Sequence, residues 1–147
     1  MDIVLLEDDP LQEDFIKSKL EEAGAFPQAK VIVIRTESEF RNRLEEIVQL
    51  QPSVVVLDVM VRWADPAPDM ELPTEDVRRE KYYTAGIRCA GLLANACSET
   101  PIILYTILEE SDLRERLDRL PKSVVHLGKG LEITPLIEKI REVARGR

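Results

Sequence analysis

Four reactive clusters in this chain each follow a short apolar run, and this placement strongly limits the folds that the chain can adopt. The runs cover residues 3–6, 54–57, 102–105 and 124–127, and the side chains that follow them are Glu7, Asp8, Asp9, Asp58, Thr106 and Lys129. Short apolar runs that alternate with helical patterns are typical of buried parallel strands. Because the carboxyl ends of parallel strands form the ligand crevice of an open sheet, we expect these side chains to converge on one site.

Helical patterns lie between the runs. The first begins at Pro10 and ends near Gly24, and Ser38 is a candidate N-cap for the second, which extends to Val48. Further patterns cover residues 86–96, the leucines at 113, 117 and 120, and residues 137–143. With a second apolar run at 31–34, the chain shows five strands that alternate with five helices. This pattern predicts a doubly wound α/β fold, and 147 residues suit a single domain over 1–147.

The segment from Val61 to Thr84 breaks this rhythm. Most connections between a strand and the next helix have about 2–6 residues, so this segment is an insertion in the loop after the third strand. Thr74 precedes two acids, which predicts a short helix inside it. Two interpretations remain open: a tolerated surface insertion, or a lid or partner-docking element at the mouth of the crevice.

The overall charge excludes several classes of function. A formal charge of −8 argues against nonspecific nucleic-acid binding and against an anionic membrane surface. No apolar stretch approaches the roughly 20 residues of a membrane span, and no signal segment precedes the strand that starts at Asp2. Cys89 and Cys97 lie on one predicted helix, too far apart for a disulfide, so we expect two small buried side chains and a cytoplasmic location.

The acidic residues at the strand ends carry the chemistry. Glu7, Asp8 and Asp58 can share a site only if their repulsion is offset, and Mg²⁺ does this with oxygen ligands. Thr106 adds a hydroxyl group, and Lys129 adds a compact positive charge that suits a phosphoryl or carboxylate oxygen. With a cation and an ammonium group nearby, Asp58 is the candidate nucleophile toward phosphorus.

At this point the chain resembles the receiver domains of bacterial two-component response regulators. The matching segments are Leu5-Leu6-Glu7-Asp8-Asp9-Pro10, Val56-Leu57-Asp58-Val59-Met60, Tyr105-Thr106 and Lys129. Their order and separations resemble the family throughout, apart from the expansion between Met60 and Gly86. The resemblance covers essentially the whole chain, and it implies a flavodoxin-like parallel sheet with strand order 2-1-3-4-5 and helices on both faces.

The resemblance also implies a role for each matching residue. Asp58 is expected to accept phosphate from the phosphohistidine of a histidine kinase or a phosphotransfer protein. Glu7, Asp8, Asp58 and the main-chain carbonyl of Met60 are expected to bind Mg²⁺. Thr106 and Lys129 are expected to contact the phosphoryl group and to couple its arrival to a partner-binding face. Such a protein catalyses its own phosphorylation and dephosphorylation but is not a turnover enzyme.

Several positions depart from the family pattern. Ile107 replaces a small residue and is expected to crowd the phosphoryl site, and Gly130 replaces a proline that is often preceded by a cis bond. His126, the only histidine, occupies the position of an aromatic switch residue, where protonation of its ring would make the switch sensitive to pH. Met60 and Leu108 flank the path of the attacking water in this family, and neither can orient a water molecule. The sequence therefore predicts slow autodephosphorylation.

Two other functions are open to a chain of this kind. A degenerate receiver would act as a protein-interaction module without phosphorylation. A phosphohydrolase with an aspartyl nucleophile is disfavoured, because such enzymes commonly have a second aspartate where this chain has Met60. No helix-turn-helix follows the last helix, which ends at Arg145-Gly146-Arg147, so the chain is either a stand-alone receiver that acts through a partner surface or a piece of a longer protein. For the chain itself we expect a downstream protein partner and no direct contact with nucleic acid. A homodimer linked to phosphorylation is also open.

Overall fold

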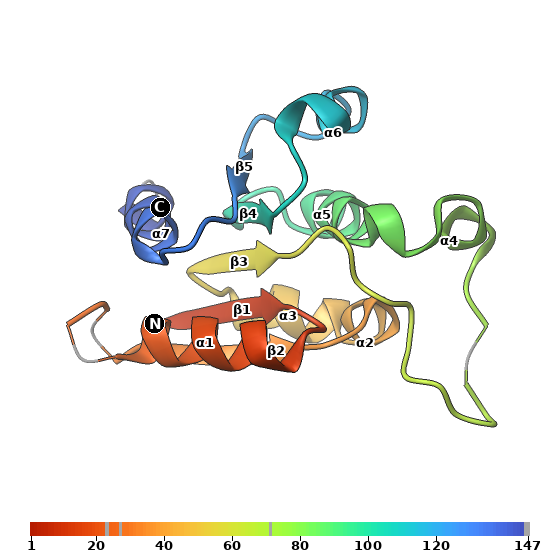
Figure 1. Ribbon diagram of the computed structural model, residues 1–147, viewed down its shortest axis with the longest axis horizontal. Helices are drawn as coiled ribbons and strands as arrows, with labels where there is room; N and C mark the ends of the chain where they lie inside the picture. The colour runs from red at the N-terminus through yellow and green to blue at the C-terminus, as the bar shows by residue number, and fades with distance from the viewer. Residues whose placement is uncertain (23, 27, 71, 146–147) are drawn as a thin grey trace.

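Five parallel strands form one sheet at the centre of the molecule (Figure 1). The computed structural model describes residues 1–22, 24–26, 28–70 and 72–145, so Gly146 and Arg147 of the predicted last helix lie outside the described residues. The strands are β1 (Asp2–Leu6), β2 (Lys30–Ile34), β3 (Val54–Leu57), β4 (Ile102–Thr106) and β5 (Val124–Gly128). Their order is β2-β1-β3-β4-β5, and every neighbouring pair is parallel. The predicted strand order is therefore confirmed.

Helices cover both faces of this sheet, as the sequence predicts. The helical elements are α1 (Pro10–Glu21), α2 (Glu37–Asn42), α3 (Leu44–Leu50), α4 (Glu75–Glu80), the 3₁₀ helix η1 (Lys81–Thr84), α5 (Ala85–Ala96), α6 (Glu110–Leu117) and α7 (Thr134–Arg145). Helices α1 and α7 contribute to one apolar core, and helices α2, α3, α5 and α6 contribute to the other. Because α1 follows β1 on one face and the chain after β3 leaves toward the other face, a crevice opens between these two connections.

The alternation of side chains along the strands produces the two cores. In β1, Ile3 and Leu5 point into the core beneath α1 and α7, whereas Val4 and Leu6 point into the core beneath α2, α3 and α5. All four residues of β3 are buried, as expected for a central strand covered on both faces. The strands at the centre of the sheet thus present their last residues from a rigid, fully packed base.

Two local predictions are wrong in the second helical region. Thr36, not Ser38, caps α2, because its hydroxyl group accepts a hydrogen bond of 3.2 Å from the backbone N–H of Glu39. The predicted continuous helix is also divided, with Arg43 between α2 and α3 at φ −102° and ψ 9°. Apolar periodicity continues through such a break because both short helices pack on the same core.

After β3 the insertion forms an extended loop that protrudes from the protein. It then returns through α4 and η1 to α5, at the right of Figure 1. The short helix predicted after Thr74 is present as α4. Both cysteines are free, but only Cys89 is buried, so the prediction of two buried cysteines is wrong for Cys97 at the C-cap of α5. Among the described residues, no helix has the length and apolar character that crossing a membrane requires.

Candidate functional site

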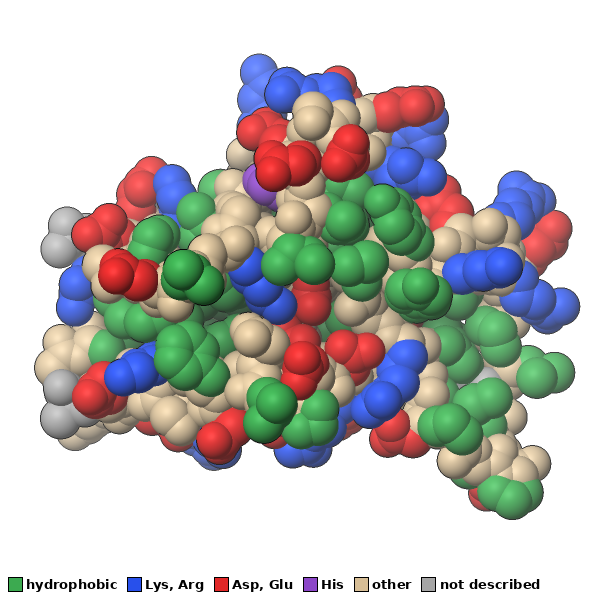
Figure 2. Space-filling model, in the orientation of Figure 1, with side chains coloured by type: hydrophobic (Ala, Val, Ile, Leu, Met, Phe, Trp, Pro, Cys, Tyr) green, Lys and Arg blue, Asp and Glu red, His purple; other side chains and the backbone are tan. Residues whose placement is uncertain are grey.

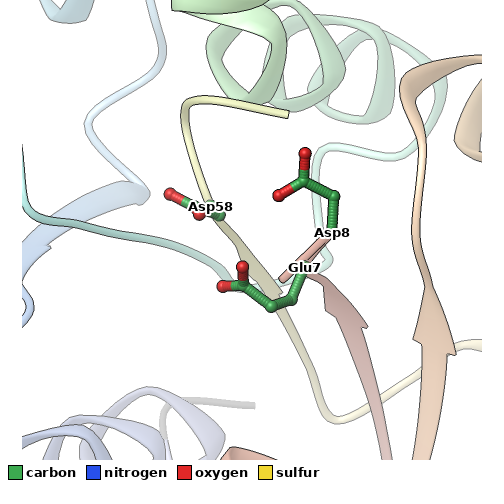
Figure 3. Close-up of side chains that lie close together, drawn as sticks. All are labelled: Glu7, Asp8 and Asp58. Carbon is green, nitrogen blue, oxygen red and sulfur yellow. The ribbon is translucent and has the colours of Figure 1, made fainter. Parts of the chain in front are cut away.

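Three carboxylates converge at the carboxyl ends of β1 and β3. Glu7 and Asp8 directly follow β1, and Asp58 directly follows β3, which pairs with β1 in parallel register. One oxygen of each carboxylate lies within 4.8 Å of the others (Figure 3). The placement is a direct consequence of topology, because neighbouring parallel strands end at the same edge of the sheet.

Lys129 reaches the same carboxylates from the other side. The backbone N–H of Lys129 donates a hydrogen bond of 2.8 Å to the carbonyl of Thr106, which fixes the start of the loop after β5. The Nζ atom then lies 2.7 Å from Oε2 of Glu7 and 3.3 Å from Oδ2 of Asp58. The aliphatic part of the side chain is largely buried, and Nζ lies 5.6 Å from the ring centre of Tyr105. One ammonium group therefore joins two acids that would otherwise repel each other.

Burial and charge shift the titration of these three groups. Burial raises the pKa of Glu7 to about 7, the nearby charge of Asp58 adds to this rise, and Lys129 opposes it. Burial also raises the pKa of Asp58, against the lowering effect of Lys129. For Lys129, burial alone would lower the pKa, but Asp58 and Glu7 outweigh it and the pKa rises. The site therefore holds excess negative charge that a further cation would relieve.

Backbone N–H groups fix the orientation of the carboxylates. The N–H of Val59 donates to Oδ1 of Asp58 at 2.7 Å, and the N–H of Arg62 donates to Oδ2 of Asp8 at 3.1 Å. Asp9 has a different role, since its Oδ1 accepts from the N–H of Leu11 and caps α1. Of the three acids after β1, two thus face the site and the third starts a helix.

The carboxylates line an open cavity of about 590 Å³. Its walls come from the ends of β1 and β3 and from the loops after β4 and β5, and the lining includes Gln12, Met60, Ile107, Gly130 and Leu131. Acidic side chains gather near the centre of the face shown in Figure 2, next to basic and apolar ones. Hard carboxylate oxygens with open space beside them suit Mg²⁺, which takes few protein ligands and keeps several waters. The donor set of Glu7, Asp8 and Asp58 therefore fits the magnesium ion that the sequence predicts.

Gly86 is a residue of the site that the sequence pattern indicates only as part of a helix. A Cβ atom at this position would lie 2.0 Å from the backbone carbonyl oxygen of Asp58, far inside any real contact. The N–H of Gly86 also donates a hydrogen bond of 2.8 Å to the carbonyl of Val59. The start of α5 thus packs directly against the backbone of the proposed phosphoacceptor. A glycine in the first turn of a predicted helix is the signal that could have identified this contact.

The other predicted residues take different positions. Thr106 is fully buried and does not line the cavity, and its hydroxyl oxygen accepts a hydrogen bond of 3.1 Å from the N–H of Leu108. His126 is partly buried, with Nε2 3.1 Å from the carbonyl oxygen of Leu108. Ile107 lies at the rim with 68% of its surface exposed, so the expected crowding of the site is absent in this arrangement. The peptide bond before Gly130 is trans, like all those that the structure describes.

Comparisons with known proteins support the same fold. No model of a known protein family matches the sequence, and no curated protein sequence matches it either. Among solved structures, it is similar to a two-component response regulator of the LuxR family from an Aurantimonas species, with a TM-score of 0.69, 16% identity and coverage of 99% of this chain and 86% of that one.

Two further solved structures resemble the chain over nearly its full length. A CheY-like response regulator receiver domain protein from Methanospirillum hungatei has a TM-score of 0.69 at 18% identity, with coverage of 99% of this chain and 94% of that one. The response regulator TrrA from Thermotoga maritima, solved in complex with Mg²⁺ and BeF, has a TM-score of 0.66 at 20% identity, with 97% of each chain covered. The chain therefore has the fold of response-regulator receiver domains, with an acidic crevice at the carboxyl edge of its sheet.

Proposed function

We propose that the protein is a phosphoacceptor receiver of a two-component signalling system, in which Asp58 takes a phosphoryl group from a phosphohistidine. The observation that carries this proposal is the shared contact of Lys129 with Glu7 and Asp58 at the mouth of an open cavity. A structural ion pair needs no cavity beside it, whereas a phosphoryl acceptor needs space for an incoming donor. The receiver fold and the TrrA structure with Mg²⁺ and BeF support the same assignment.

The chemistry of the transfer is a substitution at phosphorus. An oxygen of Asp58 attacks the phosphorus, a P–O bond forms, the P–N bond breaks, and the leaving imidazole takes a proton from solvent. The N–H of Val59 holds one oxygen of Asp58 in place. Lys129, which touches Asp58 before transfer, balances negative charge as the phosphoryl group arrives.

Glu7, Asp8 and Asp58 are the residues that would hold a magnesium ion, with the Met60 carbonyl as a further ligand. Bound there, Mg²⁺ would neutralise charge on the phosphoryl oxygens and on the acids. Glu7 and Asp8 are positioned for this by the N–H groups of Asp9 and Arg62, respectively. Burial and the charge of Asp58 raise the pKa of Glu7 to about 7. Because a metal ligand must be deprotonated, binding of a cation should strengthen as the pH rises and Glu7 ionises.

The switch that follows phosphorylation is proposed to start at Thr106. Its hydroxyl group is bonded to the N–H of Leu108, and turning toward a phosphoryl group would break this bond. Leu108 in turn offers its carbonyl to His126, so a change at Thr106 would reach the loop after β4 and the side chain on β5. A downstream protein partner that binds this face would detect the change.

Direct phosphorylation tests the proposal. The protein is incubated with Mg²⁺ and a small acyl or amido phosphate, and its intact mass is measured. The wild type should gain about 80 Da, as for one phosphoryl group. Asp58→Asn should remain unmodified, and Asp69→Asn, which changes an exposed aspartate of the insertion, should behave as the wild type. No adduct on the wild type, or an equal adduct on Asp58→Asn, would favour the phosphorylation-independent interaction module.

A further inference from the structure

The insertion forms a second concave surface, separate from the phosphoacceptor cavity. This surface, called here the insertion groove, has a volume of about 380 Å³. Its apolar part consists of Trp63, Pro73, Val77 and Tyr82, and Val77 is buried beneath it. Tyr82 remains 58% exposed. In Figure 2 apolar side chains gather on the protruding segment at the lower right, which Figure 1 identifies as the loop between β3 and α4. An exposed aromatic side chain beside an apolar hollow is typical of a contact surface for another molecule.

The remaining lining of the insertion groove is cationic. Arg62, Arg78 and Lys81 contribute to it, and none of the described carboxylates does. Arg62 is 3.1 Å from the exposed Asp65. Within the described part of the chain, neither Arg78 nor Lys81 has a carboxylate at ion-pair distance, and Nε of Arg78 instead donates to the carbonyl of Pro73 at 3.1 Å. On a protein with 28 acidic residues and a net charge of −8, an apolar groove whose described charged lining residues are all cations is a marked local exception.

A network of buried charges holds the groove in place from below. Glu37, at the start of α2, is fully buried and accepts hydrogen bonds from Arg41 and from Arg88 of α5. Arg41 extends outward to Asp76 of α4 at 3.1 Å and lies 5.6 Å from the ring centre of Trp63. Arg41 therefore connects both walls of the insertion groove to the body of the protein.

Backbone hydrogen bonds fix the same two walls. The N–H groups of Glu37 and Ser38 donate to the carbonyls of Arg62 and Trp63 at 3.0 and 2.8 Å. On the other wall, Nη2 of Arg88 donates to the carbonyl of Lys81 at 2.6 Å, where the backbone bends sharply at a φ of 57°. A non-glycine residue holds such a conformation when its surroundings stabilise it. The groove is thus preformed, which lowers the entropic cost of binding.

From these observations we infer that the insertion groove binds an acidic segment of a partner protein that presents one large apolar side chain. The apolar side chain would pack against Trp63, Pro73 and Tyr82, and flanking carboxylates would pair with Arg78 and Lys81. Aromatic and basic groups also suit nucleic acid, but its charge on every phosphate is repelled by a protein of net charge −8 more strongly than a short segment with a few carboxylates is. The inference does not depend on phosphorylation of Asp58, since none of the groove residues lines the phosphoacceptor cavity.

Trp63 offers a direct readout, because it is the only tryptophan of the chain. The full chain is titrated with a short capped peptide in which one phenylalanine is flanked on both sides by glutamates, and the emission of Trp63 is recorded. The control peptides replace phenylalanine by alanine, or the glutamates by glutamines. A saturable change in emission is expected with the acidic phenylalanine peptide below about 1 mM, and binding at least about tenfold weaker is expected for both controls.

Charge reversal tests the location. Arg78→Glu/Lys81→Glu should weaken binding at least about tenfold, whereas Arg119→Glu/Lys122→Glu, an equal change of charge after α6 and outside the groove, should not. Circular dichroism of each variant establishes that it is folded. The inference is overturned if the acidic peptide leaves Trp63 unchanged, or if both double variants bind alike. It is equally overturned if a thymidine oligonucleotide binds more tightly than the peptide, or if sedimentation shows a dimer that Arg78→Glu/Lys81→Glu abolishes.

Discussion

The guanidinium group of Arg88 donates two hydrogen bonds to the carboxylate of Glu37, from Nε at 2.9 Å and from Nη2 at 2.7 Å. Glu37 starts α2 and Arg88 lies in α5, so this pair joins two helices that are 51 residues apart in sequence. Glu37 has no exposed surface, and its carboxylate depends on its partners for solvation.

Replacing Arg88 by methionine should therefore destabilise the fold strongly. Removal of one partner from a buried ion pair costs about 3–5 kcal/mol, and the lower end is expected here because Arg41 still donates to Glu37. Urea unfolding measures the change. Arg79→Met is the matched control, since Arg79 pairs with Glu75 on the exposed side of α4 and should change stability by less than about 1 kcal/mol. Equal losses for the two variants would contradict the structural role of Glu37.

Gly86→Ala should disturb the site through a backbone contact. The added Cβ would meet the carbonyl oxygen of Asp58 at 2.0 Å, so α5 or the chain after β3 must move. A loss of about 1–3 kcal/mol is expected from such overpacking, with slower phosphorylation of Asp58. Gly91→Ala in the same helix is the control, because its Cβ meets only Leu120 at 3.7 Å. That variant should gain up to about 1 kcal/mol in helix propensity, and both values come from denaturant melts.

Asp8 and Asp9 are adjacent acids for which we expect opposite results. Mg²⁺ should raise the melting temperature of the wild type, because it binds the folded site and not the unfolded chain. Asp8→Asn should lose most of this rise. Asp9→Asn should keep it, since Asp9 caps α1 and is not part of the carboxylate cluster. Thermal melts with and without Mg²⁺ distinguish the two, and a loss of the rise in both variants would show a diffuse acidic surface instead of a site.

Glu7 should make the metal-free protein less stable as the pH rises. Its pKa is about 7 in the folded protein and has the ordinary value of 4.5 when the chain unfolds. Between these values the folded state holds a proton that the unfolded state has released, so raising the pH through this window removes stability. Glu7→Gln lacks this titration.

The melting temperature of Glu7→Gln relative to the wild type should therefore increase from about pH 5 to about pH 8, in a buffer with a chelator. Glu138→Gln, which changes an exposed glutamate of α7, serves as the control and should follow the wild type at every pH. A constant difference between Glu7→Gln and the wild type would show that the pKa of Glu7 is not raised.

Met60 should lengthen the life of the phosphorylated state. It lines the cavity beside Asp58 and cannot hold a water molecule for attack on the phosphoryl group. Met60→Asn should shorten the half-life of the phosphorylated protein by about tenfold, which corresponds to about 1.4 kcal/mol in the barrier. Loss of the phosphoryl mass with time gives the rate. Met70→Asn places the same change on the exposed insertion and should leave the half-life unchanged.

The sequence predicts the sheet and the convergence of the charged side chains at its edge well, because both follow from local patterns. Apolar runs locate the strands. Because parallel strands end at the same edge of the sheet, this alone brings Glu7, Asp58 and Lys129 together. The helix that starts at Pro10 is also well marked, since Asp9 and Pro10 are both strong start signals.

Long-range contacts between polar groups escape such reasoning. Glu37 looks like an ordinary surface charge in a polar stretch, whereas Arg88 lies among small and apolar residues of α5, and only the fold brings the two together. The break at Arg43 and the cap at Thr36 depend on hydrogen bonds that the apolar pattern does not encode. Whether the hydroxyl group of Thr106 points into the cavity or away from it depends on its hydrogen-bond partner, which here is the N–H of Leu108.

Each end of the insertion is held by a hydrogen bond to a residue in or beside the acidic cluster. At its start the N–H of Arg62 is bonded to Asp8, and at its end the N–H of Gly86 is bonded to the carbonyl of Val59. The intervening chain is therefore a closed detour whose length and composition can change while its two anchor points stay fixed, and lengthening such a loop costs little free energy. A change in this detour can therefore alter the insertion groove without moving the acidic cluster of Glu7, Asp8 and Asp58.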